Sequence, residues 1–258
     1  MKALSAAIKI AIFSSLVVAS SAGYARAADV TFLCAFALQS AMQELIPEFE
    51  KASGNSVHVE YASIGAITER VRKGDEVDVG SVSSQQWERL QKENKIVSGP
   101  KAVLGKVGLG VFVKKGASRP DIGSVDSFKR AILNAHSIAI PDPNKGFPVG
   151  TYLIPLFERL GISGDIQQKL QFTGGGPAPM KLVAKGDAEI GFSFMNEIVA
   201  SPDVDFVGPL PADIQNFTIY TVVIPASAKD AVAGMALIDF LTSPRAVSVF
   251  KLKHFDAE

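Results

Sequence analysis

This sequence of 258 residues has a single cysteine, few long apolar segments and no excess of either charge. Cys34 is the only cysteine, so the chain cannot form an intramolecular disulfide. Beyond the N-terminus no apolar run approaches the roughly 18 residues of a membrane-spanning helix. The 26 basic side chains equal the 26 acidic ones, which argues against a nucleic-acid-binding protein. The remaining composition, 47% hydrophobic and 20% charged, is ordinary for a folded soluble protein and excludes a disordered or collagen-like chain.

Residues 1–27 have the pattern of a secretory signal peptide. Lys2 and Lys9 supply positive charge, residues 10–22 are apolar or small, and Ala25-Arg26-Ala27 matches the small-x-small site of signal peptidase. An N-terminal membrane anchor is the alternative, but the apolar stretch is short for a bilayer span. We predict cleavage after Ala27 and export. The mature chain then keeps 23 of the 26 basic side chains against 26 acidic ones, a net charge of −3.

The cysteine and histidines do not predict a catalytic thiol or a metal site. Cys34 lies in the apolar run 30–36, which predicts a buried strand. His58, His136 and His254 are scattered along the chain and lack the close spacing of metal ligands. The phosphate-binding P-loop and the Gly-x-Ser-x-Gly elbow of serine hydrolases are also missing. We therefore expect no metal and no cofactor.

Strand-like and helix-like patterns alternate in two successive runs after residue 28. In the first run we predict strands at 30–36, 57–61, 77–82 and 106–113, with helices at 38–52, 65–73 and 85–93. In the second run we predict strands at 137–140, 189–194 and 217–224, with helices at 125–134, 151–160, 178–185, 229–241 and 244–251. The β-α-β order favours parallel strands with crossover helices, which is an α/β fold class.

The two runs predict two lobes, because each is too short to fill one large domain. The strand at 106–113 is long enough to cross between lobes, and the strand at 217–224 could return the chain. We predict one lobe from residues 28–107 plus 222–258 and the other from 108–221. Two crossings make a hinge, and a cleft between hinged lobes is a common place for a small ligand.

The strand-to-helix junctions are the candidate binding elements. They lie at Phe36-Ala37, Ser63-Ile64-Gly65, Val149-Gly150-Thr151 and Gly174-Gly175-Gly176, the last before Pro177 at an expected first helical position. Each junction presents unpaired backbone N–H groups and the positive end of a helix dipole. Taken singly, each could be an ordinary loop. Four of them around one cleft predict an anion site without a fixed cationic partner.

Motifs along nearly the whole mature chain resemble periplasmic molybdate-binding proteins. The similarity runs through Ala41-Met42-Gln43-Glu44-Leu45, Tyr61-Ala62-Ser63-Ile64-Gly65-Ala66, Pro148-Val149-Gly150-Thr151-Tyr152 and Phe240-Leu241-Thr242-Ser243-Pro244-Arg245-Ala246. The resemblance implies the two-lobed type II periplasmic binding protein fold with a two-strand hinge. It further implies a monomer that carries a small anion to an ABC transporter permease.

The chain departs from those proteins at the ligand. Ala37 and Ile64 stand where the family has serine hydroxyls, Phe194 stands where a tyrosine is common, and Gly176 replaces a valine. A tetraoxyanion needs its oxygens filled by hydrogen bonds, so these losses disfavour molybdate and tungstate. We predict an organic carboxylate instead. The predicted ligand-binding residues are Phe36, Ala37, Ser63, Ile64, Gly65, Val149, Gly150, Thr151, Gly174, Gly175, Gly176, Phe194 and Asn196.

An enzyme is the alternative function, because periplasmic aconitate isomerases resemble the same family. Such an isomerase moves a proton on a tricarboxylate and needs a general base. Glu69 and Glu197 are the nearest candidates, although each could be an ordinary surface carboxylate. A cleft with two or more cations and a buried carboxylate favours the enzyme, and one lined by backbone N–H groups favours transport. We favour the carrier, and we expect Lys181 to face solvent away from the site.

Overall fold

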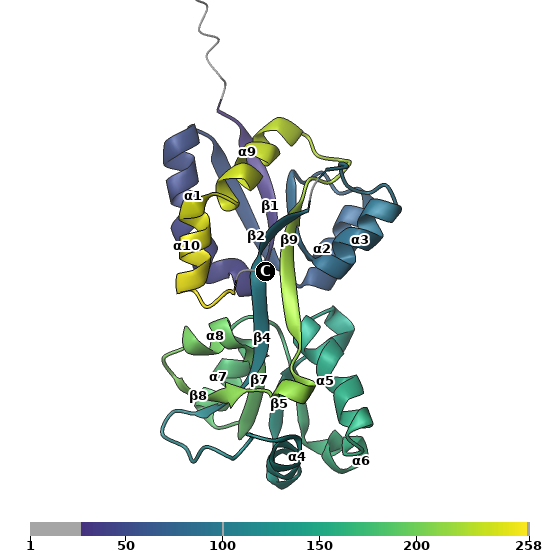
Figure 1. Cartoon of the computed structure of the whole chain (residues 1–258), viewed down its shortest axis with the longest axis vertical. Helices are drawn as coiled ribbons and strands as arrows, with labels where there is room; N and C mark the ends of the chain where they lie inside the picture. The colour runs from purple at the N-terminus through teal and green to yellow at the C-terminus, as the bar shows by residue number, and fades with distance from the viewer. Residues whose placement is uncertain (1–26, 100, 257–258) are drawn as a thin grey trace, which may run out of the picture.

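The computed structural model describes residues 27–99 and 101–256, which form two lobes stacked along the long axis of the molecule (Figure 1). This arrangement confirms the predicted α/β class and its two-lobed form. The predicted signal peptide, apart from Ala27, falls outside the described residues and stays a prediction.

The upper lobe in Figure 1 is a parallel sheet covered by helices. Its sheet strands are β1 (Asp29–Ala35), β2 (Ser56–Ala62) and β3 (Val79–Ser83), and its helices are α1 (Gln39–Ser53), α2 (Ile64–Lys73), α3 (Ser84–Lys92), α9 (Ala231–Leu241) and α10 (Pro244–Leu252). β1 pairs in parallel with β2 and β3. α1 buries Met42, Leu45 and Phe49, which lie on one face of the helix, and it contacts α9 and α10. The C-terminal helices therefore cover the N-terminal sheet.

The lower lobe repeats this scheme. Its strands are β5 (Ile138–Pro141), β6 (Leu170–Thr173), β7 (Ile190–Phe194) and β8 (Val204–Pro209), and its helices are α4 (Val125–Asn134), α5 (Pro148–Arg159), α6 (Ser163–Ile166), α7 (Ala178–Lys185) and α8 (Met195–Val199). β5 pairs in parallel with β6 and β7. The carboxyl ends of both parallel sheets lead into the region between the lobes, which places the first turns of α2 and α5 there.

Two strands, β4 (Ala102–Lys114) and β9 (Phe217–Val223), connect the lobes. The first half of β4 pairs antiparallel with β9, and its second half, from Leu109, pairs antiparallel with β7 and β8. β9 also pairs with β3 of the upper lobe. One strand thus belongs to both sheets. The predicted lobe bounds, 28–107 plus 222–258 against 108–221, remain our proposal for how the chain divides around these strands.

The structure adds elements that the sequence analysis did not predict. These are β6, β8, α6 and α8, together with the 3-10 turns η1 (Phe36–Leu38), η2 (Pro143–Lys145), η3 (Gln167–Lys169) and η4 (Ala212–Ile214). The largest shift of a predicted helix start is that of α5. α5 begins at Pro148, three residues before the predicted start, because proline fits the first helical position. α7 begins at Ala178 as predicted, but Pro177 is its N-cap rather than its first helical residue.

One cluster of buried hydrophobic residues runs through both lobes, and a second, smaller one that includes Phe112 and Met180 lies in the lower lobe. Cys34 is fully buried in β1, as the sequence predicts, and burial raises the pKa of its thiol well above the usual range. No single helix within the described ranges is long and apolar enough to cross a membrane. α9 and α10 together meet that criterion by length and composition, but they bend by 60° at their junction.

Candidate ligand-binding site

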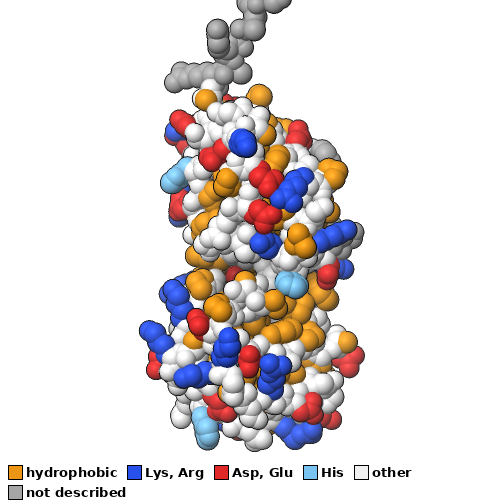
Figure 2. Space-filling model, turned by 90° about the vertical axis from the view of Figure 1, so that its left-hand side faces the viewer, with side chains coloured by type: hydrophobic (Ala, Val, Ile, Leu, Met, Phe, Trp, Pro, Cys, Tyr) orange, Lys and Arg blue, Asp and Glu red, His pale blue; other side chains and the backbone are white. Residues whose placement is uncertain are grey.

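Two adjoining cavities lie between the lobes, where the space-filling view shows a groove at mid-height (Figure 2). The larger, here called the chamber, has a volume of about 320 Å³. The smaller, the inner cavity, has about 20 Å³. Four residues line both: Phe36, Ala37, Gly176 and Glu197. A small-ligand site needs a few hundred cubic ångströms, so the chamber, not the inner cavity, is large enough for an organic acid.

The lobes touch directly beside these cavities. The Ser63 hydroxyl donates to the Lys145 carbonyl oxygen at 2.6 Å, and the Gly65 N–H donates to the Gly146 carbonyl oxygen at 3.2 Å. A Cβ atom added to Gly65 would lie 2.7 Å from the Gly146 Cα. The structure is therefore a closed form, with α2 packed against the turn that precedes α5.

These contacts change the expected role of the Ser63 junction. The Ser63 hydroxyl oxygen also accepts from the Ala66 N–H at 3.1 Å, so that hydroxyl both donates and accepts within the protein. The Gly65 N–H is likewise taken by Gly146. Two donors predicted for the ligand thus hold the lobes together instead. Ser63 still lines the inner cavity, whereas Gly65 lines neither cavity.

The thirteen predicted ligand-binding residues separate into two groups. Those that line at least one cavity are Phe36, Ala37, Ser63, Ile64, Val149, Gly175, Gly176, Phe194 and Asn196. Those that line neither are Gly65, Gly150, Thr151 and Gly174. The Thr151 hydroxyl donates to the Pro148 carbonyl within α5, and a Cβ on Gly150 would lie 2.0 Å from the Pro141 carbonyl oxygen. Gly150 therefore permits close packing of α5 on β5.

The glycine run before α7 is shaped by two aromatic rings. A Cβ on Gly175 would lie 2.2 Å from Phe147 Cε1, and one on Gly176 would lie 3.0 Å from Phe36 Cδ1. Gly176 has a φ of 60°, which favours glycine. The Phe36 and Phe147 rings contact each other across the lobes, with centroids 6.3 Å apart. The loop therefore needs glycine in order to fit under these rings.

The inner cavity has few side-chain hydrogen-bond donors. The departures noted in the sequence, Ala37, Ile64 and Phe194, all line it, and each is at most 4% exposed. Tyr220 also lines it, and burial raises the pKa of that phenol well above its ordinary range. A dehydrated oxyanion placed here would meet carbon where a molybdate site needs hydroxyls.

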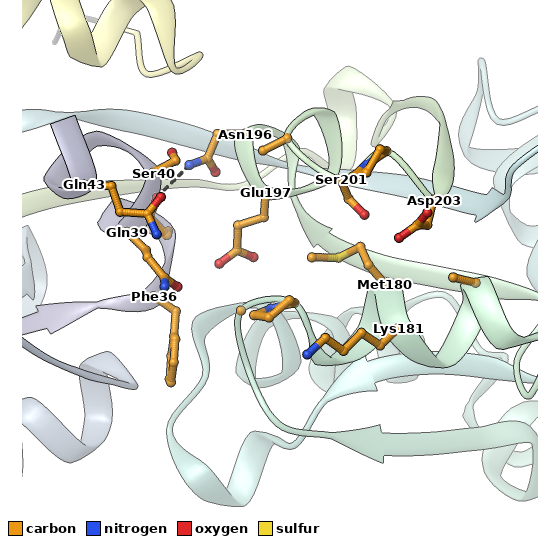
Figure 3. A pocket seen from close by; sticks show the side chains of 16 residues that line it. Phe36, Gln39, Ser40, Gln43, Met180, Lys181, Asn196, Glu197, Ser201 and Asp203 are labelled. Carbon is orange, nitrogen blue, oxygen red and sulfur yellow. Dashed lines mark hydrogen bonds between the residues drawn. The ribbon is translucent and has the colours of Figure 1, made fainter.

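Glu197 is the carboxylate that both cavities share. It follows β7 in the first turn of α8, and its side chain points into the chamber (Figure 3). The hydroxyl of Ser193, four residues earlier in β7, donates to Glu197 Oε2. Burial raises the pKa of Glu197 to about 7, and hydrogen bonds from Ser193 and the Phe194 backbone act in the opposite direction. Glu69, the other candidate base, is exposed on α2, pairs with Arg72 and lines neither cavity.

The chamber also contains polar residues that the sequence analysis did not assign to the site. Gln39, Ser40 and Gln43 line its upper-lobe wall, and Lys181, Ser201 and Asp203 line its lower-lobe wall (Figure 3). Lys181 is exposed, as expected, but it also lines the chamber, which the sequence analysis did not foresee. The spacing of Gln39 and Gln43 predicts that they share one face of a helix. That this face lines a cavity depends on the position of the second lobe, which the sequence does not show.

Asn196 joins the lobes at the chamber. It is 3% exposed, and its Nδ2 donates to the Ala37 carbonyl oxygen at 2.7 Å. Because a carbonyl can only accept, this contact fixes the orientation of the amide. Asn196 Oδ1 then has no hydrogen-bond partner among the described residues. Asn196 thus supports the closed form, while its Oδ1 is buried beside the chamber without a partner in the part of the chain that the structure describes.

Comparisons with known proteins agree with this architecture. Residues 30–256 match the family described as bacterial extracellular solute-binding protein. The chain is 26% identical to an aconitate isomerase of Pseudomonas sp. over 227 residues, covering 86% of this chain and 85% of the relative. It is 28% identical to the molybdate-binding protein ModA of Azotobacter vinelandii over 247 residues, covering 92% and 95%. The solved periplasmic molybdate-binding protein of Azotobacter vinelandii aligns with a TM-score of 0.73 at 17% identity, over 89% of this chain and 99% of that one.

Proposed function

The chain belongs to the bacterial extracellular solute-binding proteins, the type that serves ABC importers, and we propose that it binds a small organic carboxylate in the chamber and delivers it to an importer from the periplasm. The chamber is the observation that carries this proposal. Its volume of about 320 Å³ suits an organic acid, and Lys181 supplies a cation on one wall. Phe36 and Met180 offer apolar surface for the carbon skeleton.

A tetraoxyanion is a poor occupant of this site. The inner cavity, at about 20 Å³, is lined by Ala37, Ile64 and Phe194, and the Ser63 hydroxyl is already bonded to Lys145 and Ala66. Such an anion would have to break these bonds or leave its oxygens unpaired, and each unpaired group costs about 1–3 kcal/mol. The molybdate-binding relatives therefore support the fold of this chain more than its ligand.

The test is a thermal-shift and calorimetry screen of the mature protein. The panel contains succinate, citrate, tricarballylate and both aconitate isomers, with molybdate, tungstate and sulfate as comparison anions. We expect at least one carboxylate to bind and to raise the melting temperature, since a ligand at a hundredfold excess over its Kd adds about 2.7 kcal/mol of stability. A clear rise with micromolar molybdate, and none with any carboxylate, would contradict the proposal.

Lys181→Ala tests whether the carboxylate lies in the chamber. Removing this cation should weaken binding severalfold, because Lys181 is the basic side chain that lines the chamber within the described residues. Lys185→Ala is the matched control: Lys185 lies one turn further along α7 and lines neither cavity. Equal affinities in the two variants would place the ligand elsewhere.

An isomerase acting on a tricarboxylate is the second candidate, and Glu197 is the observation that favours it. A carboxyl group with a pKa of about 7 in a cavity is suited to proton transfer at neutral pH. For an enzyme we expected a cleft with at least two cations and a carboxylate. The chamber has the carboxylate of Glu197 but, among the described residues, a single cation, Lys181. Incubating each aconitate isomer with the protein and measuring the other isomer decides the matter. Interconversion that Glu197→Gln abolishes would establish the enzyme.

A further inference from the structure

Glu197 faces the chamber without a cationic partner. Its carboxyl group accepts hydrogen bonds from the Ser193 hydroxyl and the Phe194 backbone, and it forms no ion pair within residues 27–99 and 101–256. Oε2 accepts the Ser193 bond, and the carboxyl group lines both cavities. Figure 3 shows the Glu197 side chain extending into open space, with Lys181 on the α7 side of the chamber. A ligand that fills the chamber must therefore meet this carboxyl group.

The charges around Glu197 determine whether its carboxyl group attracts or repels a carboxylate ligand. Along the chamber wall the charged residues are Glu197, Lys181 and Asp203, while the upper-lobe residues Phe36, Gln39, Ser40 and Gln43 carry no charge. With Glu197 ionised the chamber has a net charge of −1, which repels a carboxylate ligand. With Glu197 neutral the net charge is zero, and the carboxylic acid gains a proton that it can donate.

The elements packed against α8 do not alter that balance. They are β4, β7 and β8. β7 has no charged side chain, Lys106 of β4 lies over the Phe217 ring, and Asp205 of β8 accepts from the Gly116 N–H and pairs with Arg119. Lys114, at the end of β4, is exposed. From β9, Tyr220 lines the inner cavity and stays a neutral phenol at physiological pH, since burial raises its pKa.

We propose that Glu197 binds the ligand as a neutral carboxylic acid: the protein takes up a proton as the ligand enters, and Glu197 donates a hydrogen bond to a ligand carboxylate. This inference rests on the proposed function, because it names how that carboxylate is recognised. The proton comes from solvent and returns to it on release, so no bond other than O–H is made or broken. Burial raises the pKa of Glu197 to about 7, so the uptake takes place near neutral pH.

Calorimetry with tricarballylate tests the proposal, because this saturated tricarboxylate has no double bond to isomerise. If only protonated Glu197 binds, the Kd at pH 8 should be about tenfold weaker than at pH 6, given a pKa of about 7. At pH 7, titrations in two buffers of different ionisation enthalpy should show about half a proton taken up per ligand. If tricarballylate does not bind, the tightest carboxylate of the screening panel takes its place.

Two variants separate Glu197 from the ligand's own ionisation. Glu197→Gln keeps a donor and the Ser193 contact but does not titrate. It should bind within about twofold of the wild-type affinity at pH 6 and lose the pH dependence and the excess proton uptake. Glu158→Gln changes an exposed carboxylate of α5 that lines neither cavity, and it should behave as the wild type does.

Each other outcome has a distinct meaning. Identical pH profiles in the wild type and Glu197→Gln would overturn this inference while the carrier function stands. A folded Glu197→Gln protein that no longer binds at pH 6 would also overturn it, because Glu197 would then act as a charged acceptor. Failure of every panel carboxylate to bind the wild type at either pH would instead overturn the proposed function, and this inference with it.

Discussion

At the scale of single residues, the polar groups that can bind a ligand are not all the ones that the sequence predicted. Ser63 was expected to donate to an anion, but its hydroxyl is already bonded to Lys145 and Ala66. Glu197 was one of two candidate bases, and it is the one that faces both cavities. The contact between the lobes thus occupies the Ser63 hydroxyl, which an anion would need, and the carboxyl group of Glu197 faces the cavities instead. A partly buried acid with a raised pKa affects the stability of the protein as well as the binding of its ligand.

Glu197 should make the ligand-free protein less stable as the pH rises. Its pKa lies at about 7 in the folded protein against 4.5 ordinarily, so the folded state binds the proton more tightly. Its stabilising contribution is present below pH 4.5 and is lost as the pH rises toward 7. Relative to Glu197→Gln, the wild type should lose about 2–3 kcal/mol of unfolding free energy between pH 5 and 8.

Denaturant unfolding of both proteins at several pH values measures this difference. Glu158→Gln serves again as the control, because its exposed carboxyl group should leave the wild-type pH profile unchanged. Parallel stability curves for the wild type and Glu197→Gln across this range would show that the carboxyl group is as well solvated in the folded protein as in the unfolded chain.

At the scale of elements, α2 and the η2–α5 turn form a close backbone contact between the lobes. Gly65 and Gly146 lie so close that a Cβ on Gly65 would come within 2.7 Å of the Gly146 Cα, a backbone atom that cannot rotate away. Gly65 lies in the first turn of α2 and does not line either cavity. Its small size therefore serves closure rather than ligand contact.

Gly65→Ala should separate folding from closure. The methyl group blocks full approach of the lobes, while alanine raises the helix propensity of α2 by up to about 1 kcal/mol. We expect the ligand-free melting temperature to stay the same or rise and the carboxylate Kd to weaken at least tenfold. Gly164→Ala, at the same position of α6 with open space around its Cβ, is the matched control. Wild-type affinity in Gly65→Ala would show that binding does not need this contact.

The elements also show what the sequence could predict. Helices with a strong apolar stripe or a clear N-cap were predicted within a few residues, as α1 and α4 illustrate. β6 was not predicted, because its four residues Leu170–Thr173 alternate in polarity over too short a run to indicate a strand, and none of them is buried. The junctions near Phe36 and Gly176 were predicted from helix starts and do line the cavities. The pairings Ser63–Lys145 and Gly65–Gly146 could not be predicted, since they depend on how two lobes approach.

At the scale of the whole molecule, closure is held by few bonds and guided by two strands. β4 belongs to both sheets and β9 runs beside its first half, so bending these strands would move the lobes as units (Figure 1). Three hydrogen bonds cross between the lobes at the cavities, from Ser63, Gly65 and Asn196. Each contributes about 1 kcal/mol net, so together they make the closed form attainable without freezing it.

Asn196→Ala should shift this balance toward the open form. The variant loses the 2.7 Å bond to the Ala37 carbonyl, and in the open form that carbonyl regains water. A loss of about 1 kcal/mol in closure weakens ligand binding about fivefold, because only the closed form encloses the ligand. Small-angle scattering should then show a larger radius of gyration for the ligand-free variant than for the ligand-free wild type, with the two equal at saturating carboxylate. Asn134→Ala, on the exposed end of α4, should change neither quantity. If Asn196→Ala binds with wild-type affinity and unchanged dimensions, this bond does not contribute to closure, and the contacts of Ser63 and Gly65 must hold the lobes together.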